Sequence, residues 1–248
     1  MKMRSCVFTV CLFLLISGCD HTQPSGTAAP EVTPTVYAPG EVFTLTAEDN
    51  LTLAATIYRA EGDLAVVFTH MGIADQTSWQ DFAGDTASQG ITTLTFDFHC
   101  FGLSECSQGL SAELNLADTL VAIRYLRDQG YERIACVGAC MGGSACLHAS
   151  MQEDLAGMVF VAGPRELIPN GKIYPDDIVN PAMPKLFIFA EQDPYSSVIS
   201  ATQTYYDVSP EPKQLISYFE AAHATDLFKT PSSSQFHQAL MDFLLAIK

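Results

Sequence analysis

A short apolar run that ends in a glycine-rich turn, between Ile134 and Ala145, constrains the fold of this chain more than any other stretch. It reads Ile-Ala-Cys-Val-Gly-Ala-Cys-Met-Gly-Gly-Ser-Ala, so β-branched and apolar residues come first and a helix-forming segment comes last. A strand that turns sharply into a helix needs small residues around the turn, because the residue at its tip has a strained backbone. Gly138, Cys140 and Gly142 fit the pattern G-x-C-x-G of a nucleophile elbow, with cysteine at the tip.

The place of Cys140 before a helix gives its sulfur a possible chemical role. Backbone N–H groups and the helix dipole at the amino end of a helix favour a thiolate. The alternative is a glycine-rich turn that carries a buried, inert cysteine.

The amino terminus predicts an export signal. Lys2 and Arg4 precede an apolar run over 6–16 that is too short to span a bilayer, and small residues follow it. We interpret residues 1–18 as a signal peptide. The stretch Ile-Ser-Gly-Cys that ends at Cys19 resembles the lipobox of bacterial lipoproteins, and the resemblance implies lipidation of Cys19 after cleavage. The alternative is an ordinary signal peptide with a chance cysteine.

Residues 19–40 predict a tether between that lipidated cysteine and a folded domain. Four prolines lie among Ser, Thr, Gly and Ala there, and no apolar periodicity is present. Residues 41–248 are enough for one α/β domain. We therefore expect an exported lipoprotein of the bacterial cell envelope, anchored to the membrane by lipid on Cys19.

The charge balance restricts the partners. The chain has 12 basic and 28 acidic residues, and cleavage before Cys19 would remove Lys2 and Arg4 and leave a formal net charge of −18. Such an acidic domain argues against binding nucleic acid and against lying flat on anionic lipid. Charge does not select a substrate, and the oligomeric state stays open.

Five cysteines follow Cys19 in the sequence, and an oxidising compartment allows some of them to pair. Cys100 and Cys106 lie in one short loop, where a bridge is sterically plausible. Cys136 and Cys146 are predicted to be small core residues of a strand and a helix. The odd number leaves at least one free thiol in a monomer.

Strands and helices alternate along the rest of the chain, which predicts a parallel sheet with helices on both faces. The expected strands span 42–47, 51–59, 64–69, 91–98, 134–137, 157–162, 185–190 and 213–219. The expected helices span 77–89, 111–129, 141–152, 197–206 and 232–246, with Ser111 as a cap and glycines after the first two.

Three residues of chemical interest follow predicted strands in the order Cys140, Asp193, His223. In an open parallel sheet, sites form outside the carboxyl ends of the strands. Nucleophile, acid and histidine in this order are typical of the α/β-hydrolase fold. A thiolate attacks a carbonyl carbon, histidine holds and returns the proton, and the carboxylate orients the imidazole.

The segment Gly-Ala-Cys-Met-Gly-Gly around Cys140 resembles the elbow of the dienelactone hydrolase family, whose nucleophile is also cysteine. The resemblance covers about residues 51–247 and includes Phe-Asp-Phe at 96–98, Asp193-Pro194 and Ala222-His223. It implies an α/β-hydrolase fold with Cys140 as nucleophile, Asp193 as acid and His223 as base. In the segment that follows Asp97 the family usually has Arg-Gly, whereas this chain has His99-Cys100. We therefore assign no residue that would bind a carboxylate of the substrate.

Two backbone N–H groups are expected to stabilise the oxyanion. One donor is the N–H of Met141, which follows the nucleophile. The other comes from the loop after the strand 64–69, where His70-Met71-Gly72 resembles a His-Gly signature. We favour Met71 for this donor, with Gly72 close behind.

The other titratable residues have plainer interpretations. His237 is expected at the surface and His148 in packing, while His99 lies near a strand end and either lines the site or does not. Glu191 and Asp226 compete with Asp193, but only Asp193 precedes a proline turn at a strand end. Asp97 is expected to tie loops together. No metal site is expected, because no cluster has ligand spacing, and no phosphate-binding loop or cofactor is indicated.

These observations together predict a hydrolase of small carboxylic esters, lactones or thioesters that works through an acyl-cysteine intermediate. A non-catalytic lipoprotein that binds a ligand or partner on the same scaffold is the alternative from a different class, since fold alone does not establish activity. An acyltransferase is a third reading.

Overall fold

The computed structural model describes residues 39–106, 111–165 and 180–248. The predicted signal peptide, Cys19 and nearly all of the predicted tether lie outside the described residues. Among the helices in the described part of the chain, none is both long and apolar enough to cross a membrane.

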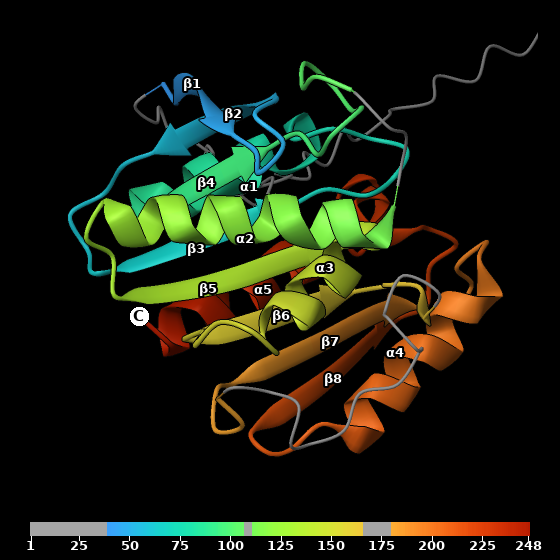
Figure 1. Cartoon of the computed structure of the whole chain (residues 1–248). Helices are drawn as coiled ribbons and strands as arrows, with labels where there is room; N and C mark the ends of the chain where they lie inside the picture. The colour runs from blue at the N-terminus through green and yellow to red at the C-terminus, as the bar shows by residue number, and fades with distance from the viewer. Residues whose placement is uncertain (1–38, 107–110, 166–179) are drawn as a thin grey trace, which may run out of the picture. The chain divides into compact units, whose positions relative to one another are not determined.

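An eight-stranded, mostly parallel sheet forms the centre of the domain (Figure 1). Its strands are β1 (Glu41–Thr46), β2 (Thr52–Tyr58), β3 (Leu64–Thr69), β4 (Thr92–Phe96), β5 (Arg133–Ala139), β6 (Gly157–Val161), β7 (Lys185–Ala190) and β8 (Lys213–Tyr218). They lie in the order β1-β2-β4-β3-β5-β6-β7-β8. Only the pairs β1–β2 and β2–β4 of this sheet are antiparallel, so the predicted parallel sheet is confirmed.

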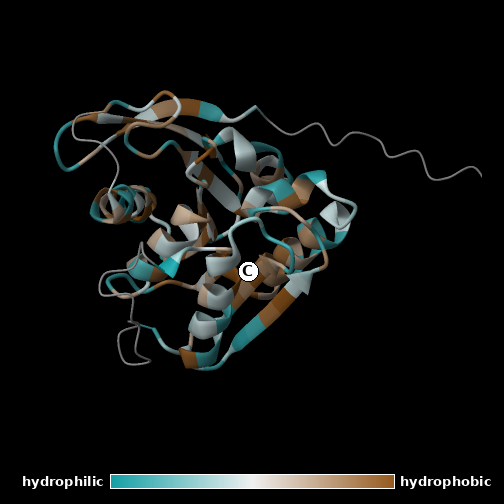
Figure 2. Cartoon of the chain, turned by 90° about the vertical axis from the view of Figure 1, so that its right-hand side faces the viewer, coloured by the Kyte–Doolittle hydropathy of each residue, from teal (hydrophilic) through white to brown (hydrophobic). Residues whose placement is uncertain are grey.

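Helices cover both faces of the sheet, as the alternating pattern predicted (Figure 1). They are α1 (Thr77–Ser88), α2 (Ala112–Asp128), α3 (Met141–Ala149), α4 (Ser196–Val208) and α5 (Ser233–Ala246). One core cluster packs α2, α3 and α4 on one face, through residues such as Ile123 and Tyr205. The other packs α1 and α5 on the opposite face, through Trp79 and Leu240. Hydrophobic colour follows the strands between these layers (Figure 2).

The central strands β3, β5 and β7 are buried except for Arg133 at the start of β5, because both faces of the sheet are covered. The predicted cap of α2 is present, since the Ser111 Oγ accepts a hydrogen bond from the Leu114 N–H at 3.1 Å. Two details differ from the prediction. The helix α3 ends at Ala149 rather than near 152, and an unpredicted 3₁₀ helix, η4 (Ala224–Lys229), follows His223.

Two disulfides correct the prediction for two cysteines. Cys100 and Cys106 are bridged, as their loop allowed. Cys136 and Cys146 are bridged as well, so they are not the unpaired core residues that we expected. The sharp turn folds α3 back on β5 and brings their Cα atoms to 5.5 Å, within the range for a disulfide. Cys140 is the free cysteine of the described residues.

Candidate active site

The sharp turn between β5 and α3 holds Cys140 in a conformation that non-glycine residues seldom adopt. Its φ is 52° and its ψ is −121°, and its N–H donates to the Val161 carbonyl at 2.8 Å. The flanking glycines have no room for a side chain: a Cβ on Gly138 would lie 2.2 Å from the Gly142 oxygen, and one on Gly142 would lie 2.4 Å from the Thr69 oxygen. The glycine pattern therefore reflects close packing of β5, α3 and the end of β3.

Asp193 and His223 lie beyond the carboxyl ends of the neighbouring strands β7 and β8 and contact each other. The Nδ1 atom of His223 lies 2.9 Å from the Oδ2 atom of Asp193, and both side chains are buried. The second carboxylate oxygen of Asp193 accepts the Tyr195 N–H at 2.9 Å. The carboxylate is thus fixed at both oxygens and orients the imidazole.

Cys140 lines the same cavity as His223 and interacts with its imidazole, so the three residues lie in one row at the edge of the sheet. Burial lowers the pKa of His223, but the hydrogen bonds and charge interactions with Asp193 and Cys140 outweigh it and raise the pKa from 6.5 to about 9. An imidazolium at neutral pH is the form that pairs with a thiolate.

The loop after β3 is organised by His70. The Phe98 N–H donates to the Nε2 atom of His70 at 3.1 Å, so the ring proton sits on Nδ1 and is donated to the Met71 carbonyl at 2.8 Å. Burial lowers the pKa of His70, which keeps the ring neutral. The Met71–Gly72 peptide is trans, so the Gly72 N–H points away from the carbonyl that His70 holds.

Asp97 ties two loops at this edge of the sheet, as predicted. One carboxylate oxygen accepts the Gln76 N–H at 2.8 Å, and the other accepts the Leu103 N–H at 2.9 Å. The loops that follow β3 and β4 are therefore held against each other beside the elbow.

A cavity of about 170 Å³ opens over Cys140 and His223. Its lining residues come from the segments that follow β3, β5, β6, β7 and β8, including the first turn of α4, and they are Gly72, Ile73, Cys140, Pro164, Tyr195, Ser197, Val198 and His223. The Tyr195 ring meets the His223 ring edge to face, with centroids 4.8 Å apart. Sequence reasoning missed Tyr195 and Val198, although their position just after Asp193-Pro194 placed them near the site.

The two acidic residues that competed with Asp193, and His99, make contacts elsewhere. Glu191 accepts a hydrogen bond from Ser217 at 2.8 Å, and Asp226 pairs with Lys229 at 2.9 Å. His99 does not line the cavity; its ring lies between Asp118, at 2.7 Å, and Asp49.

The other two histidines in the described part of the chain lie on helices. His148 is buried on α3, as predicted. His237 is only half exposed, because its ring packs on Phe82 and bonds to Asp85. Within residues 39–106, 111–165 and 180–248, no group of three or more potential ligands is placed to hold a metal ion.

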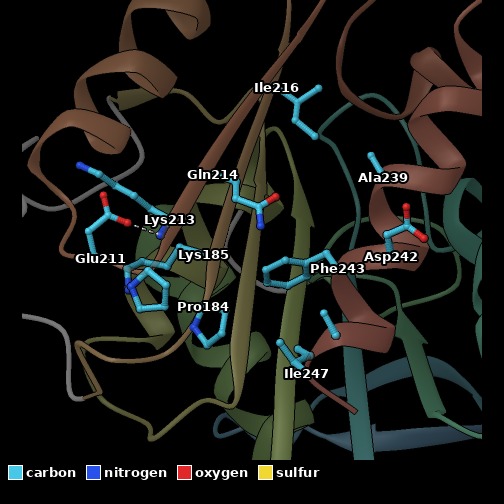
Figure 3. A pocket seen from close by; sticks show the side chains of 12 residues that line it. Pro184, Lys185, Glu211, Lys213, Gln214, Ile216, Ala239, Asp242, Phe243 and Ile247 are labelled. Atoms are coloured by element: carbon cyan, nitrogen blue, oxygen red, sulfur yellow. Dashed lines mark hydrogen bonds between the residues drawn. The ribbon is translucent and has the colours of Figure 1, made fainter.

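A larger hollow of about 610 Å³ lies away from this chemistry, between β8 and α5 (Figure 3). Gln214 and Ile216 of the strand and Phe243 of the helix face it, and Lys185 stands at one end. The Lys185 ammonium is satisfied by the Pro181 and Met183 carbonyls. This hollow contains none of the three residues of the Cys140–His223–Asp193 row.

The chain resembles solved structures of hydrolases over most of its length. A dienelactone hydrolase from Anabaena variabilis matches with a TM-score of 0.67 and 18% identity, over 84% of this chain and 99% of that one. The esterase Pf2001 from Pyrococcus furiosus matches with a TM-score of 0.66 and 17% identity, over 85% of this chain and 93% of that one. A comparison with curated proteins finds no match. At these identities the structures establish the fold, so the predicted α/β-hydrolase fold is confirmed.

A family model gives the family itself. The model described as "Dienelactone hydrolase family" matches residues 104–240, which is more than half of the chain and includes Cys140, Asp193 and His223. The chain belongs to the dienelactone hydrolase family and is a hydrolase of carboxylic esters.

Proposed function

We propose that the protein cleaves small carboxylic esters, lactones or thioesters through an acyl-cysteine intermediate, with Cys140 as nucleophile, His223 as acid and base, and Asp193 as the residue that orients His223. The observation that carries this proposal is the position of Cys140 beside His223 in one cavity, with His223 hydrogen-bonded to Asp193. Cys140 lies at the tip of the strained turn, and both Cys140 and His223 line the small cavity.

Acylation begins with the Cys140 thiolate attacking the carbonyl carbon of the ester. The S–C bond forms, the C–O bond to the leaving group breaks, and the His223 imidazolium gives its proton to the leaving oxygen. The sulfur loses its charge in the thioester, so one source of the raised His223 pKa disappears. His223 then takes a proton from water as that water attacks the thioester carbonyl: the new C–O bond forms, the S–C bond breaks, the acid leaves, and the Cys140 thiolate is restored beside the His223 imidazolium.

The oxyanion formed at each step needs donors already in place. Met141 is the first residue of α3, and the first N–H groups of a helix have no partner within it. For the second donor we now prefer Gly72 to Met71. Gly72 lines the cavity, and the trans peptide directs its N–H away from the carbonyl held by His70.

The test is to detect acylation of the protein by mass spectrometry. The domain from Pro39 onward, produced in an oxidising compartment so that both disulfides form, is mixed with p-nitrophenyl acetate and followed by intact-mass spectrometry. We expect a transient acetyl adduct on Cys140 together with turnover, and neither in Cys140→Ala. Full hydrolytic activity of Cys140→Ala would remove the proposal, and a stable adduct without turnover would indicate an acyltransferase that lacks its acceptor.

We also propose that residues 1–18 direct export and that Cys19 carries the lipid anchor. The two disulfides fit an oxidising compartment outside the cytoplasm. Expression of the full chain in bacteria should give a membrane-bound protein whose amino-terminal peptide bears acyl chains at Cys19. Cys19→Ser should release it into the soluble fraction, and an unmodified, still membrane-bound variant would contradict the anchor.

A further inference from the structure

The wall of the cavity over Cys140 is apolar and uncharged apart from the catalytic histidine. Ile73, Pro164, Tyr195 and Val198 supply hydrocarbon surface, Ser197 a small polar group and Gly72 its backbone. Among the described lining residues there is no lysine, arginine or carboxylate. The positive charge of His223 is already paired with the Asp193 carboxylate.

Arginine is present nearby in sequence but not in the wall. Arg165 follows Pro164, yet it is exposed and does not line the cavity. A carboxylate on a substrate therefore meets no matching cation among the described lining residues.

Hydrogen bonds hold the backbone of three wall residues, Pro164, Tyr195 and Val198, in place before a ligand arrives. The Ser144 hydroxyl donates to the Pro164 carbonyl at 2.8 Å, and Asp193 accepts the Tyr195 N–H. The Val198 N–H in turn donates to the Tyr195 carbonyl at 2.9 Å, and Val198 is only 2% exposed. Pre-formed walls of this kind discriminate by fit, because no ordering cost is incurred on binding.

Size and charge then limit what enters. The volume of about 170 Å³ resembles that of a dry cavity of about 150 Å³ that takes up benzene. Each buried methylene improves binding about fourfold until the space is filled. A carboxylate in such a wall loses hydration without gaining a partner, and the net charge of −16 repels it on approach.

We infer that this site selects uncharged, apolar acyl groups and discriminates against acyl groups of similar length that carry a carboxylate. Ile73, Tyr195 and Val198 are the residues that set this specificity. The inference rests on the proposed function and specifies its substrate class.

Three matched esters test it with the wild-type domain: p-nitrophenyl hexanoate, mono-p-nitrophenyl adipate, which adds a terminal carboxylate, and its methyl ester, which adds the same bulk without charge. We expect kcat/KM for the hexanoate to exceed that for the charged adipate at least about tenfold. The methyl ester should stay within about threefold of the hexanoate, since it keeps the wall free of charge. Equal rates for the charged and methylated adipates would overturn the inference.

A matched pair of variants locates the discrimination. Ile73 and Val42 are similarly exposed, at 71% and 76%, but only Ile73 lines the cavity. Ile73→Lys should raise the ratio of charged to methylated adipate at least about fivefold, because the new ammonium meets the carboxylate. Val42→Lys, with the same change in net charge, should leave that ratio within about twofold. Equal ratios in the two variants would overturn the assignment to the cavity wall.

Failure of the proposed function has a different signature. Each ester is also given to Cys140→Ala, and turnover that persists there would remove the cysteine mechanism whatever the ratios. Cys140-dependent turnover that favours the charged adipate would leave the mechanism intact and overturn the specificity alone.

Discussion

The Nδ1 atom of His223 and the Oδ2 atom of Asp193 lie 2.9 Å apart, although 30 residues separate them in sequence. They meet because β7 and β8 are parallel neighbours whose carboxyl ends reach the same edge of the sheet. Both side chains are buried, so water does not compete for the bond. The bond fixes the orientation of the His223 ring and leaves its Nε2 atom free of Asp193.

Asp193→Asn tests this bond at nearly constant shape. An amide can present an N–H to Nδ1, which would place the ring proton on the wrong nitrogen. We expect kcat for p-nitrophenyl acetate to fall by about 10²- to 10⁴-fold, with little change in KM. Steady-state kinetics measure this, and circular dichroism checks that the variant is folded.

Glu191→Gln is the matched control, since it makes the same carboxylate-to-amide change on the same strand end. Glu191 is exposed and bonds to Ser217, so its activity should stay within about twofold of wild type, as for most surface changes. If both variants lost activity equally, the special role of Asp193 would be refuted.

The titration of His223 should report its contact with Cys140. In the wild type the imidazole should titrate near pH 9. Because the pKa is raised on folding, the stabilisation from this proton is fully present below pH 6.5 and is lost as the pH rises through about 9. Cys140→Ser removes the interactions with the sulfur that raise the pKa of His223, so the midpoint should fall toward 6.5. NMR of ring-labelled histidine, assigned with His223→Gln, measures both midpoints, and identical values would contradict the pairing.

The three chemical residues could be placed from sequence because each follows a recognisable buried strand. Cys140, Asp193 and His223 are local features of strand ends, and a parallel sheet brings such ends together. The disulfide between Cys136 and Cys146 could not be placed in this way. It depends on the angle at which α3 folds back on β5, and strand and helix patterns do not give that angle.

Backbone orientation was the other property that residue types did not predict. The sequence gives no reason to prefer the N–H of Met71 or that of Gly72. Only the hydrogen bond from His70 to the Met71 carbonyl distinguishes the directions of the two N–H groups. The cavity wall was missed for a related reason. Tyr195 and Val198 look like ordinary helix-start residues until the Asp193 turn is seen to point them at Cys140.

Neighbouring glycines of the elbow should differ sharply in tolerance. A Cβ on Gly142 would lie 2.4 Å from the Thr69 backbone oxygen, whereas one on Gly143 would lie 3.1 Å from its nearest neighbour. We expect Gly142→Ala to destabilise the fold by about 2 kcal/mol or more, as overpacking of a core does. Gly143→Ala should change stability by less than about 1 kcal/mol, because alanine also favours the helix. Urea unfolding of the pair measures this, and equal losses would contradict the close contact.

The disulfide between Cys136 and Cys146 clamps the strand and the helix that carry Cys140. The double variant Cys136→Ala/Cys146→Ala should lose about 2–4 kcal/mol of unfolding free energy. It should also lose kcat, since the turn at Cys140 is less constrained. Thermal unfolding and kinetics under non-reducing conditions measure both effects.

The variant Cys100→Ala/Cys106→Ala is the control, because its bridge lies in the loop after β4 and not across the elbow. It should keep kcat within about threefold, a change of less than about 1 kcal/mol in the barrier. A larger loss of kcat in this control than in the elbow variant would argue against the clamp.

In the proposed mechanism His70 orients the Gly72 N–H through the Met71 carbonyl, and variants of His70 should separate that role from simple packing. His70→Leu removes the donor to the Met71 carbonyl and leaves the Phe98 N–H unpaired, so it should lower kcat by about 10²-fold or more while KM changes little. His70→Asn keeps one donor and one acceptor and should recover part of kcat. Burial lowers the pKa of His70, so the wild-type rate should show no inflection near pH 6.5 from this residue. Equal kcat for the leucine and asparagine variants would mean that His70 acts by packing alone, and that the Gly72 N–H is not aimed through it.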